Sequence, residues 1–534
     1  MRASPRFLRV LLAVAAVCAV IVSTAAGRAT VHKTGLVWAD CGGGYQCATL
    51  NVPRDYHHPG RGTFSLGIIR LPAQDQAHRI GPLFVNFGGP GGLAVDTIHA
   101  IGGDLFGAVN DRFDIVAVDP RGVGHTQPSV DCQANQEEQG IYSKPFVTPF
   151  NLEVDALIAK DKGYIDRCKS LNGDVLKYIS TENTARDMDS VRAAMGEAKL
   201  NYFGFSYGTF LGSTYASLFP NRYRAMVLDG PVDVKGWINR PTENLREQSA
   251  GFERALGRFF QACAANQDFC GFGGDDPAGA FDDLIDSAYV QPLPATGDDP
   301  RPVNGDDIAA GAVLAMYAKQ LWPFLADALQ QAQAGDGSGF RQLADFFYGR
   351  NSDGSYDPAS DRYFVITAAD QKYKHAVRPY LAAGNHSWGL FDHAWWNTGY
   401  TELNYGLYDV KANDVYRGPF RASARAPTVL EVATRYDPAT PYRGALRTAA
   451  ELGNVRLLTM RGDGHTAYGG NSPCIDNAVN AYVETLTLPA RGTICQQDVP
   501  FGAAPLARAA GVFGSSTLTP ASVLWRTSPH GAIN

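Results

Sequence analysis

The sequence predicts an α/β fold, in which a mostly parallel sheet is covered by helices on both faces and an inserted, mainly helical cap interrupts the chain. Short apolar runs alternate with helical stretches up to residue 232, as in chains that build such a sheet. The alternation stops at 233–425, where the pattern is mostly helical and rich in aromatic residues, and it resumes at 426. Glycine-rich or polar loops follow the apolar runs, where open α/β sheets place their active sites.

The predicted strands and helices follow one another in a regular order. The runs 49–53 and 63–71 come first, and the second alternates between apolar and polar residues, as in a half-exposed antiparallel pair. The remaining predicted strands are mostly apolar and lie at 82–87, 113–118, 201–205, 225–230, 427–433 and 455–460. Helical periodicity is clearest at 94–105, 181–199 and 475–486.

The stretch 204–208, Gly-Phe-Ser-Tyr-Gly, fits the G-x-S-x-G pattern of the nucleophile elbow of α/β-hydrolases. In such an elbow a strand turns sharply into a helix, so the serine adopts a strained backbone and its neighbours must be small. Ser206 would stand clear of the sheet as a nucleophile, with the N–H of Tyr207 beside it. A chain with 57 glycines can match this pattern by chance, so the assignment depends on the partners of Ser206.

Two loops further along the chain supply an acid and a base for Ser206. Asp437 and His465 each follow a predicted strand, and the order nucleophile, acid, base is that of α/β-hydrolases. His465 would accept the Ser206 proton and later deliver it to the leaving group, while Asp437 would orient the imidazole and stabilise its cation. Asp463 is a rival acid, but it stands only two residues from His465, too close in sequence to reach the ring naturally.

A glycine-rich loop at 88–92 follows the predicted strand 82–87, where this fold places its second oxyanion donor. Bare backbone is needed there, because the N–H must come within hydrogen-bonding reach of the developing negative oxygen. We expect the N–H groups of Gly89 and Tyr207 to form the oxyanion hole. The loop contains no Lys followed by Ser or Thr, which argues against a phosphate-binding loop.

The N-terminus predicts an export signal that is not part of the fold. Three arginines precede the apolar run 10–22, and small residues follow it. We expect residues 1–25 to be a signal peptide, cleaved near residue 25 or 26. A membrane anchor is disfavoured because a span needs about 20 apolar residues. A lipoprotein signal through Cys18 is disfavoured because a bulky residue precedes it.

Eight cysteines remain beyond the predicted signal peptide, and an even count favours disulfides in an exported chain. Proximity in sequence suggests the pairs 41–47, 132–168, 263–270 and 474–495, although eight cysteines allow 105 connectivities. Free buried thiols are the alternative. The chain has no C-x-x-C or H-E-x-x-H pattern, and we expect neither a metal nor a cofactor.

Length and composition fit a globular protein larger than one simple domain, with 534 residues, 45% hydrophobic and 19% charged. We divide the chain into a signal peptide (1–25), two core segments (26–232 and 426–505), a helical cap (233–425) and a tail of unknown role (506–534). The formal net charge of −6, without a basic block, argues against nucleic acid as a partner. We expect a monomer that is not stably inserted in a membrane once the signal peptide is removed.

Several separated motifs resemble the secreted tripeptidyl aminopeptidases of actinobacteria, in the prolyl-aminopeptidase-like group of α/β-hydrolases. These motifs lie at 87–92, 119–124, 204–208, 437–441 and 464–465, and similar stretches open and close the mature domain at 47–56 and 422–501. The resemblance covers most of 41–501. Phe87 departs from the family, which often has His there, and 366–370 lacks a cysteine that the family often carries. These departures bear on substrate length and preference.

The resemblance implies a serine exopeptidase that releases short peptides, expected to be tripeptides, from peptide substrates with a free N-terminus through an acyl-enzyme. Such an enzyme must hold an ammonium group. Asp370, Glu243 and Asp392 in the cap are candidates, but each fits a solvated surface acid better. The main alternative is a secreted carboxylesterase or lipase-like hydrolase with the same triad, because both reactions are acyl transfers. An exported binding protein on a hydrolase scaffold is a third reading, and the intact set of catalytic motifs argues against it.

Overall fold

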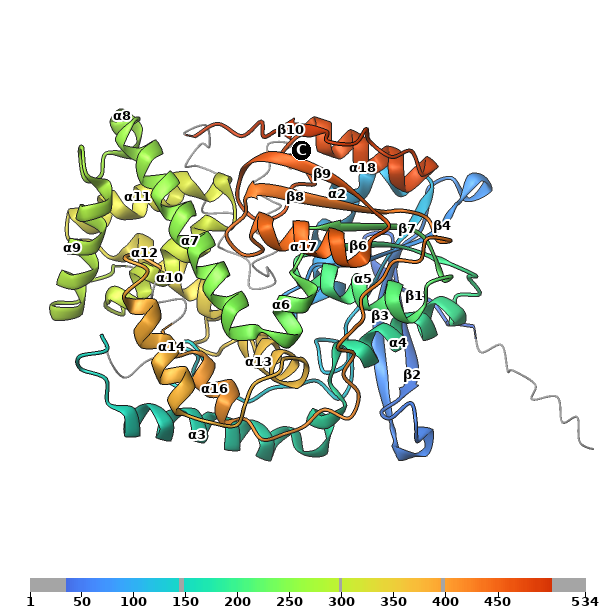
Figure 1. Cartoon of the computed structure of the whole chain (residues 1–534), viewed down its shortest axis with the longest axis horizontal. Helices are drawn as coiled ribbons and strands as arrows, with labels where there is room; N and C mark the ends of the chain where they lie inside the picture. The colour runs from blue at the N-terminus through green and yellow to red at the C-terminus, as the bar shows by residue number, and fades with distance from the viewer. Residues whose placement is uncertain (1–34, 144–147, 297–299, 395–398, 502–534) are drawn as a thin grey trace, which may run out of the picture. The chain divides into compact units, whose positions relative to one another are not determined.

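The computed structural model of this chain describes residues 35–143, 148–296, 300–394 and 399–501 (Figure 1). The predicted signal peptide at 1–25 and the tail at 506–534 lie outside the described residues. From Leu36 onward the described residues belong to one compact unit. Among them, no helix combines the length and the apolar composition needed to cross a membrane.

A ten-stranded sheet runs through this unit in the order β1-β2-β3-β5-β4-β6-β7-β8-β9-β10. The pairs β1–β2, β2–β3 and β3–β5 are antiparallel, and all other neighbours are parallel. The predicted fold class, an α/β fold with a mostly parallel sheet, is therefore confirmed. The strands are β1 Ala39–Gly42, β2 Tyr45–Pro53, β3 Thr63–Leu71, β4 Gly81–Asn86, β5 Phe113–Val118, β6 Leu200–Phe205, β7 Tyr223–Asp229, β8 Val429–Tyr436, β9 Val455–Asp463 and β10 Ile494–Gln496.

Helices cover both faces of the sheet. Alternate residues of a strand point to opposite faces, so on β4 Phe84 joins one apolar core while Leu83 and Val85 join another. The first core includes α4 and α5, and the second includes α2 and α18. These helices are α2 Ala94–Asn110, α4 Thr181–Ala194, α5 Tyr207–Leu218 and α18 Pro473–Thr485.

The helix predicted at 181–199 is shorter than expected. Ser180 caps its N-terminus by accepting the N–H of Asn183, and α4 ends at Ala194. The chain turns at Gly196, which has a φ of 79°, a left-handed conformation that favours glycine. The predicted antiparallel pairing of 49–53 with 63–71 is confirmed by the register of β2 and β3.

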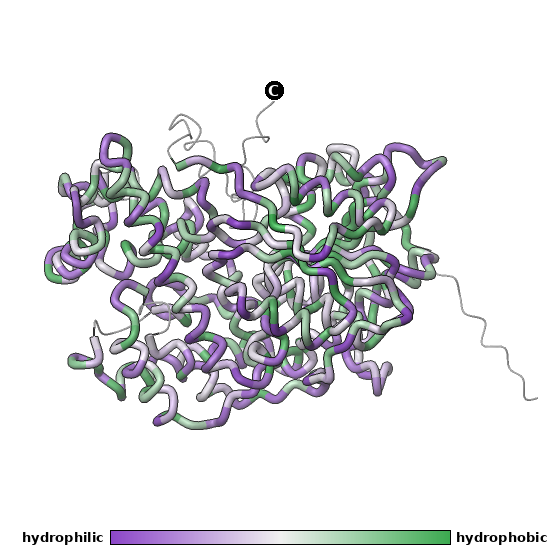
Figure 2. Tube along the Cα trace, turned by 45° about the horizontal axis from the view of Figure 1, so that its top comes forward, coloured by the Kyte–Doolittle hydropathy of each residue, from purple (hydrophilic) through white to green (hydrophobic). Residues whose placement is uncertain are grey.

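Helices between β7 and β8 enclose a core of their own, built mainly by α7, α10, α11 and α12. Purple and green both occur along the helices of this region in Figure 2. In α7, α11 and α12 only part of the residues are buried, as expected where one face is buried, whereas α10 is buried almost throughout. Helix α3 (Val154–Asn172) precedes β6 and lies in the segment assigned to the core, but it packs against α16 in the segment assigned to the cap. The domain boundaries therefore remain a prediction. The helices are α6 Val234–Asn239, α7 Pro241–Ala264, α8 Gln267–Cys270, α9 Pro277–Val290, α10 Gly305–Met316, α11 Trp322–Gln333, α12 Ser338–Tyr348, α13 Ala359–Asp370, α14 Arg378–Trp388 and α16 Glu402–Leu407.

All four predicted disulfides are present, which confirms the pairing inferred from proximity. They join Cys41 to Cys47, Cys132 to Cys168, Cys263 to Cys270 and Cys474 to Cys495. Two of them bear on the architecture around the site. The second links the loop after β5 to α3, and the fourth links α18 to the edge strand β10.

Candidate active site

Ser206 stands at the turn between β6 and α5, with a φ of 55° and a ψ of −126°. This is the strained conformation expected of a nucleophile elbow. Both glycines of the motif are sterically required. A Cβ on Gly204 would lie 2.4 Å from the oxygen of Gly208, and a Cβ on Gly208 would lie 2.5 Å from the oxygen of Asn86. The backbone N–H of Ser206 donates to the oxygen of Asp229 at 2.9 Å, which fixes the turn to the neighbouring strand β7.

Asp437 and His465 form a hydrogen-bonded pair. The two Asp437 oxygens lie 3.0 and 2.9 Å from His465 Nδ1. Since a carboxylate only accepts, Nδ1 carries the proton and Nε2 is left as an acceptor. Nε2 is buried and has no hydrogen-bond partner among the described residues. The Asp437 carboxylate also accepts the N–H groups of Ala439 and Thr440, at 2.9 and 2.8 Å, so its orientation is fixed.

Ser206 and His465 line one cavity. Its other lining residues are Phe87, Phe205, Tyr317, Ala318, Gln320, Asp463, Gly464, Thr466, Gly469 and Asn471. Two segments of this wall, at 317–318 and 320, come from the region between β7 and β8 that the sequence assigned to the cap. The carbonyl of Tyr317 accepts the backbone N–H of His465 at 2.7 Å. The structure thus brings Ser206, Asp437 and His465 to one site beneath this region.

The glycine loop lies directly against the elbow. A Cβ on Gly88 would lie 2.9 Å from Ser206 Cβ and 3.0 Å from the Tyr207 nitrogen, so no other residue fits at this contact. Within the part of the chain that the structure describes, the N–H groups of Gly89 and Tyr207 donate to no acceptor. Two free donors therefore stand on adjoining segments. The sequence indicated Gly89 but missed Gly88, whose closeness to Ser206 depends on strand pairing between β4 and β6.

Two further residues contact the pair of Asp437 and His465 or its loop. Thr440 Oγ1 donates to Asp437 Oδ2 at 3.1 Å and lies 3.3 Å from His465 Nδ1. Asp229 is fully buried at the end of β7, and its carboxylate accepts the N–H groups of Ala467 and Tyr468, at 3.0 and 2.8 Å. Burial raises the pKa of Asp229 to about 7. The sequence analysis did not single out Asp229; the signal that could have found it is an acidic residue at the end of the apolar run 225–229.

Asp463, the rival acid, makes no contact with the imidazole of His465. It accepts a hydrogen bond from Arg258 Nη2 at 3.1 Å, and Arg258 Nε also donates to it. Lys319 Nζ lies 3.9 Å away. Asp463 is the only carboxylate among the described residues that line the cavity, and these two cations neutralise it.

The three cap acids considered for ammonium binding do not line the cavity. Glu243 is exposed and pairs with Arg240, and Asp392 is exposed, so both are surface acids as expected. The expectation was wrong for Asp370, which is 1% exposed. Its carboxylate accepts the backbone N–H of Thr181 at 3.0 Å and the hydroxyl of the same residue. Nothing in the sequence around Asp370 indicated that Thr181 would be its partner.

Comparison with known proteins defines the class to which this fold and site belong. The family model of the alpha/beta hydrolase fold matches residues 81–471. The chain therefore belongs to the α/β-hydrolase family, and it is an enzyme of the serine hydrolase class with serine peptidases among its relatives.

Three relatives cover most of the chain. "Serine protease Hip1" of Mycobacterium tuberculosis is 32% identical over 92% of this chain and 98% of its own length. "Carboxylesterase B" of the same species is 34% identical over 84% of this chain and 86% of its own. "Tripeptidyl aminopeptidase" of Streptomyces lividans is 30% identical over 88% of each chain. The suspected relation to tripeptidyl aminopeptidases is confirmed at the level of the family.

Proposed function

We propose that this protein is an exported serine exopeptidase that releases short peptides, in the first instance tripeptides, from free N-termini. The observation that carries the proposal is the His465 imidazole. Its Nδ1 is fixed by Asp437, and its Nε2 has no hydrogen-bond partner within the described part of the chain. His465 lines the same cavity as the strained Ser206. This is the arrangement that acyl transfer by a serine requires.

The reaction proceeds in two halves. Ser206 Oγ attacks the scissile carbonyl while His465 Nε2 takes its proton, and the carbonyl electron pair moves onto oxygen. The N–H groups of Gly89 and Tyr207 stabilise this oxyanion. As the intermediate collapses, the C–N bond breaks and His465 protonates the leaving amine. Water then repeats the sequence on the acyl-enzyme, which frees the short peptide with a new carboxylate and restores Ser206.

The names of the relatives favour a peptide substrate and leave one alternative open. Two of the three are named as peptidases, and one of these as a tripeptidyl aminopeptidase. The third is named as a carboxylesterase, and it is slightly more identical to this chain over a shorter span. An ester-hydrolysing enzyme with the same triad is therefore the second candidate.

Export is part of the proposal. The sequence pattern of residues 1–25 supports it, and so do four disulfides, which persist in oxidising compartments. Expression in an actinobacterial host, followed by N-terminal sequencing of the protein in the medium, tests it. A new N-terminus near residue 25 or 26 is expected. Full-length chain retained in the cytosol would contradict export.

Three substrates test the activity. We would compare a tripeptide anilide with a free amino group, its N-acetylated twin and a short-chain aryl ester, under identical conditions. Rapid cleavage of the first, with the second ignored, is expected of an aminopeptidase that binds the ammonium group. Hydrolysis of the ester alone would assign the enzyme to the carboxylesterases. Equal cleavage of both anilides would show a peptidase that does not require a free N-terminus.

A further inference from the structure

We propose that helix α13 holds both arms of the oxyanion hole, with Arg362 positioning the glycine loop and Asp370 positioning Tyr207 through Thr181. These two side chains stand near opposite ends of one helix in the region assigned to the cap. The inference rests on the proposed function, since it concerns the donors expected to stabilise the oxyanion. It assigns to this helix a task in transition-state stabilisation, beyond covering the site.

The first arm is the glycine loop. Arg362 is 3% exposed, and its Nε donates to the backbone oxygen of Gly91 at 3.0 Å. Its Nη2 donates to Asp357 at 2.7 Å, which fixes the plane of the guanidinium. Helix and loop are in direct contact, because a Cβ on Gly91 would lie 2.7 Å from Arg362 Cβ.

This contact fixes the place of Gly89. The N–H of Gly92 donates to the oxygen of Gly88 at 3.2 Å, so the loop is a closed turn. Gly89 lies within that turn, where its Cβ position is 3.1 Å from the nitrogens of Gly91 and Gly92. A displacement of Gly91 therefore moves Gly89, and with it the first free N–H.

The second arm is Tyr207. Thr181 Oγ1 donates its single proton to Asp370, so the hydroxyl of Tyr207 is the donor in its own hydrogen bond to Thr181 Oγ1. All three side chains are buried. Since Tyr207 is the first residue of α5 and follows Ser206, fixing its ring fixes the residue that carries the second free N–H.

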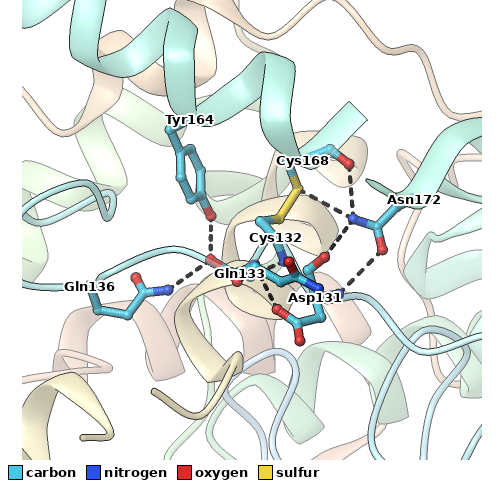
Figure 3. The surroundings of a disulfide bond; sticks show 8 residues. Asp131, Cys132, Gln133, Gln136, Tyr164, Cys168 and Asn172 are labelled. Atoms are coloured by element: carbon cyan, nitrogen blue, oxygen red, sulfur yellow. Dashed lines mark hydrogen bonds between the residues drawn. A yellow bond between two sulfur atoms is a disulfide. The ribbon is translucent and has the colours of Figure 1, made fainter. Parts of the chain in front are cut away.

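Helix α13 is itself anchored to a disulfide. Asp361, next to Arg362, accepts the backbone N–H of Cys132 at 2.9 Å and the side-chain N–H of Gln136 at 2.9 Å. It also accepts the hydroxyl of Tyr164 at 2.8 Å. Figure 3 shows Gln136 and Tyr164 pointing toward the same place beside the Cys132–Cys168 bond. The loop after β5 and α3 thus hold the end of α13 from which Arg362 reaches the glycine loop.

Stabilisation of an oxyanion depends on the distance between each N–H donor and the charged oxygen. Oxyanion donors act in a water-poor site at about 2.7–3.1 Å, and removal of one donor costs about 10²–10³ in kcat. A donor that shifts by part of an ångström loses part of this effect, and the substrate's ground-state contacts do not change. Weakening either arm should therefore lower kcat and leave KM nearly unchanged.

The test uses isosteric or conservative variants of the full mature chain. Thr181→Val removes the hydroxyl but keeps the shape of the side chain, whereas Thr181→Ser keeps the hydroxyl. Asp370→Asn and Arg362→Lys weaken each arm separately. Arg341→Lys is the matched control, because Arg341 is also a buried arginine of the cap, 6% exposed, and its partners are Glu137, Asp307 and Asp345.

Two readouts separate positioning from folding. The first is kcat and KM on whichever of the aryl ester and the tripeptide anilide the wild type cleaves faster. The second is affinity for an aryl trifluoromethyl ketone, which forms a tetrahedral adduct with an active serine. We expect Thr181→Val, Asp370→Asn and Arg362→Lys each to lower kcat about 10- to 100-fold and to weaken the ketone in parallel. Thr181→Ser should recover most of the loss, and Arg341→Lys should lower the melting temperature while kcat stays within about twofold.

The inference is overturned if Thr181→Val, Asp370→Asn and Arg362→Lys match Arg341→Lys in kcat, or if their loss appears in KM alone. Ser206→Ala, measured alongside, separates this result from a failure of the proposed function. If Ser206→Ala abolishes turnover while these three variants keep the wild-type kcat, only the inference fails. If Ser206→Ala keeps turnover, the proposed function fails and the inference with it.

Discussion

The backbone N–H of Ser206 donates to the backbone oxygen of Asp229, and the carboxylate of the same aspartate accepts two N–H groups of the loop that carries His465. One fully buried residue therefore ties the proposed nucleophile, Ser206, to the proposed base, His465, through its main chain and its side chain. This connection does not pass through Asp437. The relative position of Ser206 and His465 therefore depends on Asp229, at the end of β7.

Asp229→Asn should disturb the His465 loop, because the N–H of Ala467 lies 3.0 Å from both carboxylate oxygens and the amide would place an NH₂ donor where one of these acceptors stands. We expect a loss of about 1–3 kcal/mol in the free energy of unfolding and a fall of about tenfold in kcat. Asp233→Asn is the control, since Asp233 is a buried N-cap of α6 that accepts the N–H of Gly236. It should lose stability only. An Asp229→Asn enzyme with wild-type kcat would contradict the role of this residue.

Ser206→Ala should keep the fold and lose turnover by several orders of magnitude, as removal of a triad member does. The melting temperature should stay close to that of the wild type. Burst and steady-state kinetics, on whichever of the aryl ester and the tripeptide anilide the wild type cleaves faster, measure the effect. Substantial residual turnover in a purified variant would refute Ser206 as the nucleophile.

Gly251→Ala should move the turn that carries Asp437. A Cβ on this residue of α7 would lie 2.4 Å from the oxygen of Pro438. Gly257→Ala, on the same helix, is the control, because nothing lies within 4 Å of its Cβ position. We expect the first variant to lose about tenfold or more in kcat, and the second to gain up to about 1 kcal/mol of stability from helix propensity. Equal activity of the two would show that the turn tolerates the displacement.

Glu431 predicts a pH-dependent stability. It is fully buried in β8, neither carboxyl oxygen has a hydrogen-bond partner among the described residues, and burial raises its pKa well above the ordinary value. An acid with a raised pKa in the folded state favours folding at low pH, and this contribution is lost as pH rises above its unfolded pKa. Glu431→Gln removes the titration. The melting temperature of the variant relative to wild type should be similar near pH 4 and progressively higher toward pH 8, as scanning fluorimetry would show; a constant difference would contradict the assignment.

Cys132→Ser with Cys168→Ser should lower kcat as well as stability, because the bond supports Asp361 and thereby α13. Cys41→Ser with Cys47→Ser is the matched control, since that bond joins the edge strand β1 to its neighbour β2. Both double variants should lose stability, by about 2–5 kcal/mol for a typical native disulfide. Only the first should lose kcat, by several-fold, in assays run well below its melting temperature. Equal kcat in the two double variants would show that the Cys132–Cys168 bond does not help to position α13.

The sequence predicted the parts of this structure that local pattern determines. Buried strands such as β4 and β6 are continuous apolar runs, and the motif 204–208 requires its two glycines for steric reasons that hold in any such elbow. The short edge strands β1 and β10 were missed, because four or three residues, mostly exposed, give no periodic signal.

The contacts between distant segments could not be predicted. Asp370 was expected at the surface, yet it meets Thr181, 189 positions away in the chain. The contact between Arg362 and Gly91 spans 271 positions. Pairings of this kind depend on how the helices between β7 and β8 fold back on the sheet, which the local pattern of the sequence does not reveal.

The Cys132–Cys168 bond also has a consequence for where in the cell the enzyme works. A newly made chain in a reducing cytosol carries thiols at these positions and lacks the cross-link behind Asp361. Its α13 is then held less firmly, and both oxyanion donors with it. We expect the enzyme to reach its full kcat only after oxidation, and with the proposed export this would spare substrates inside the producing cell.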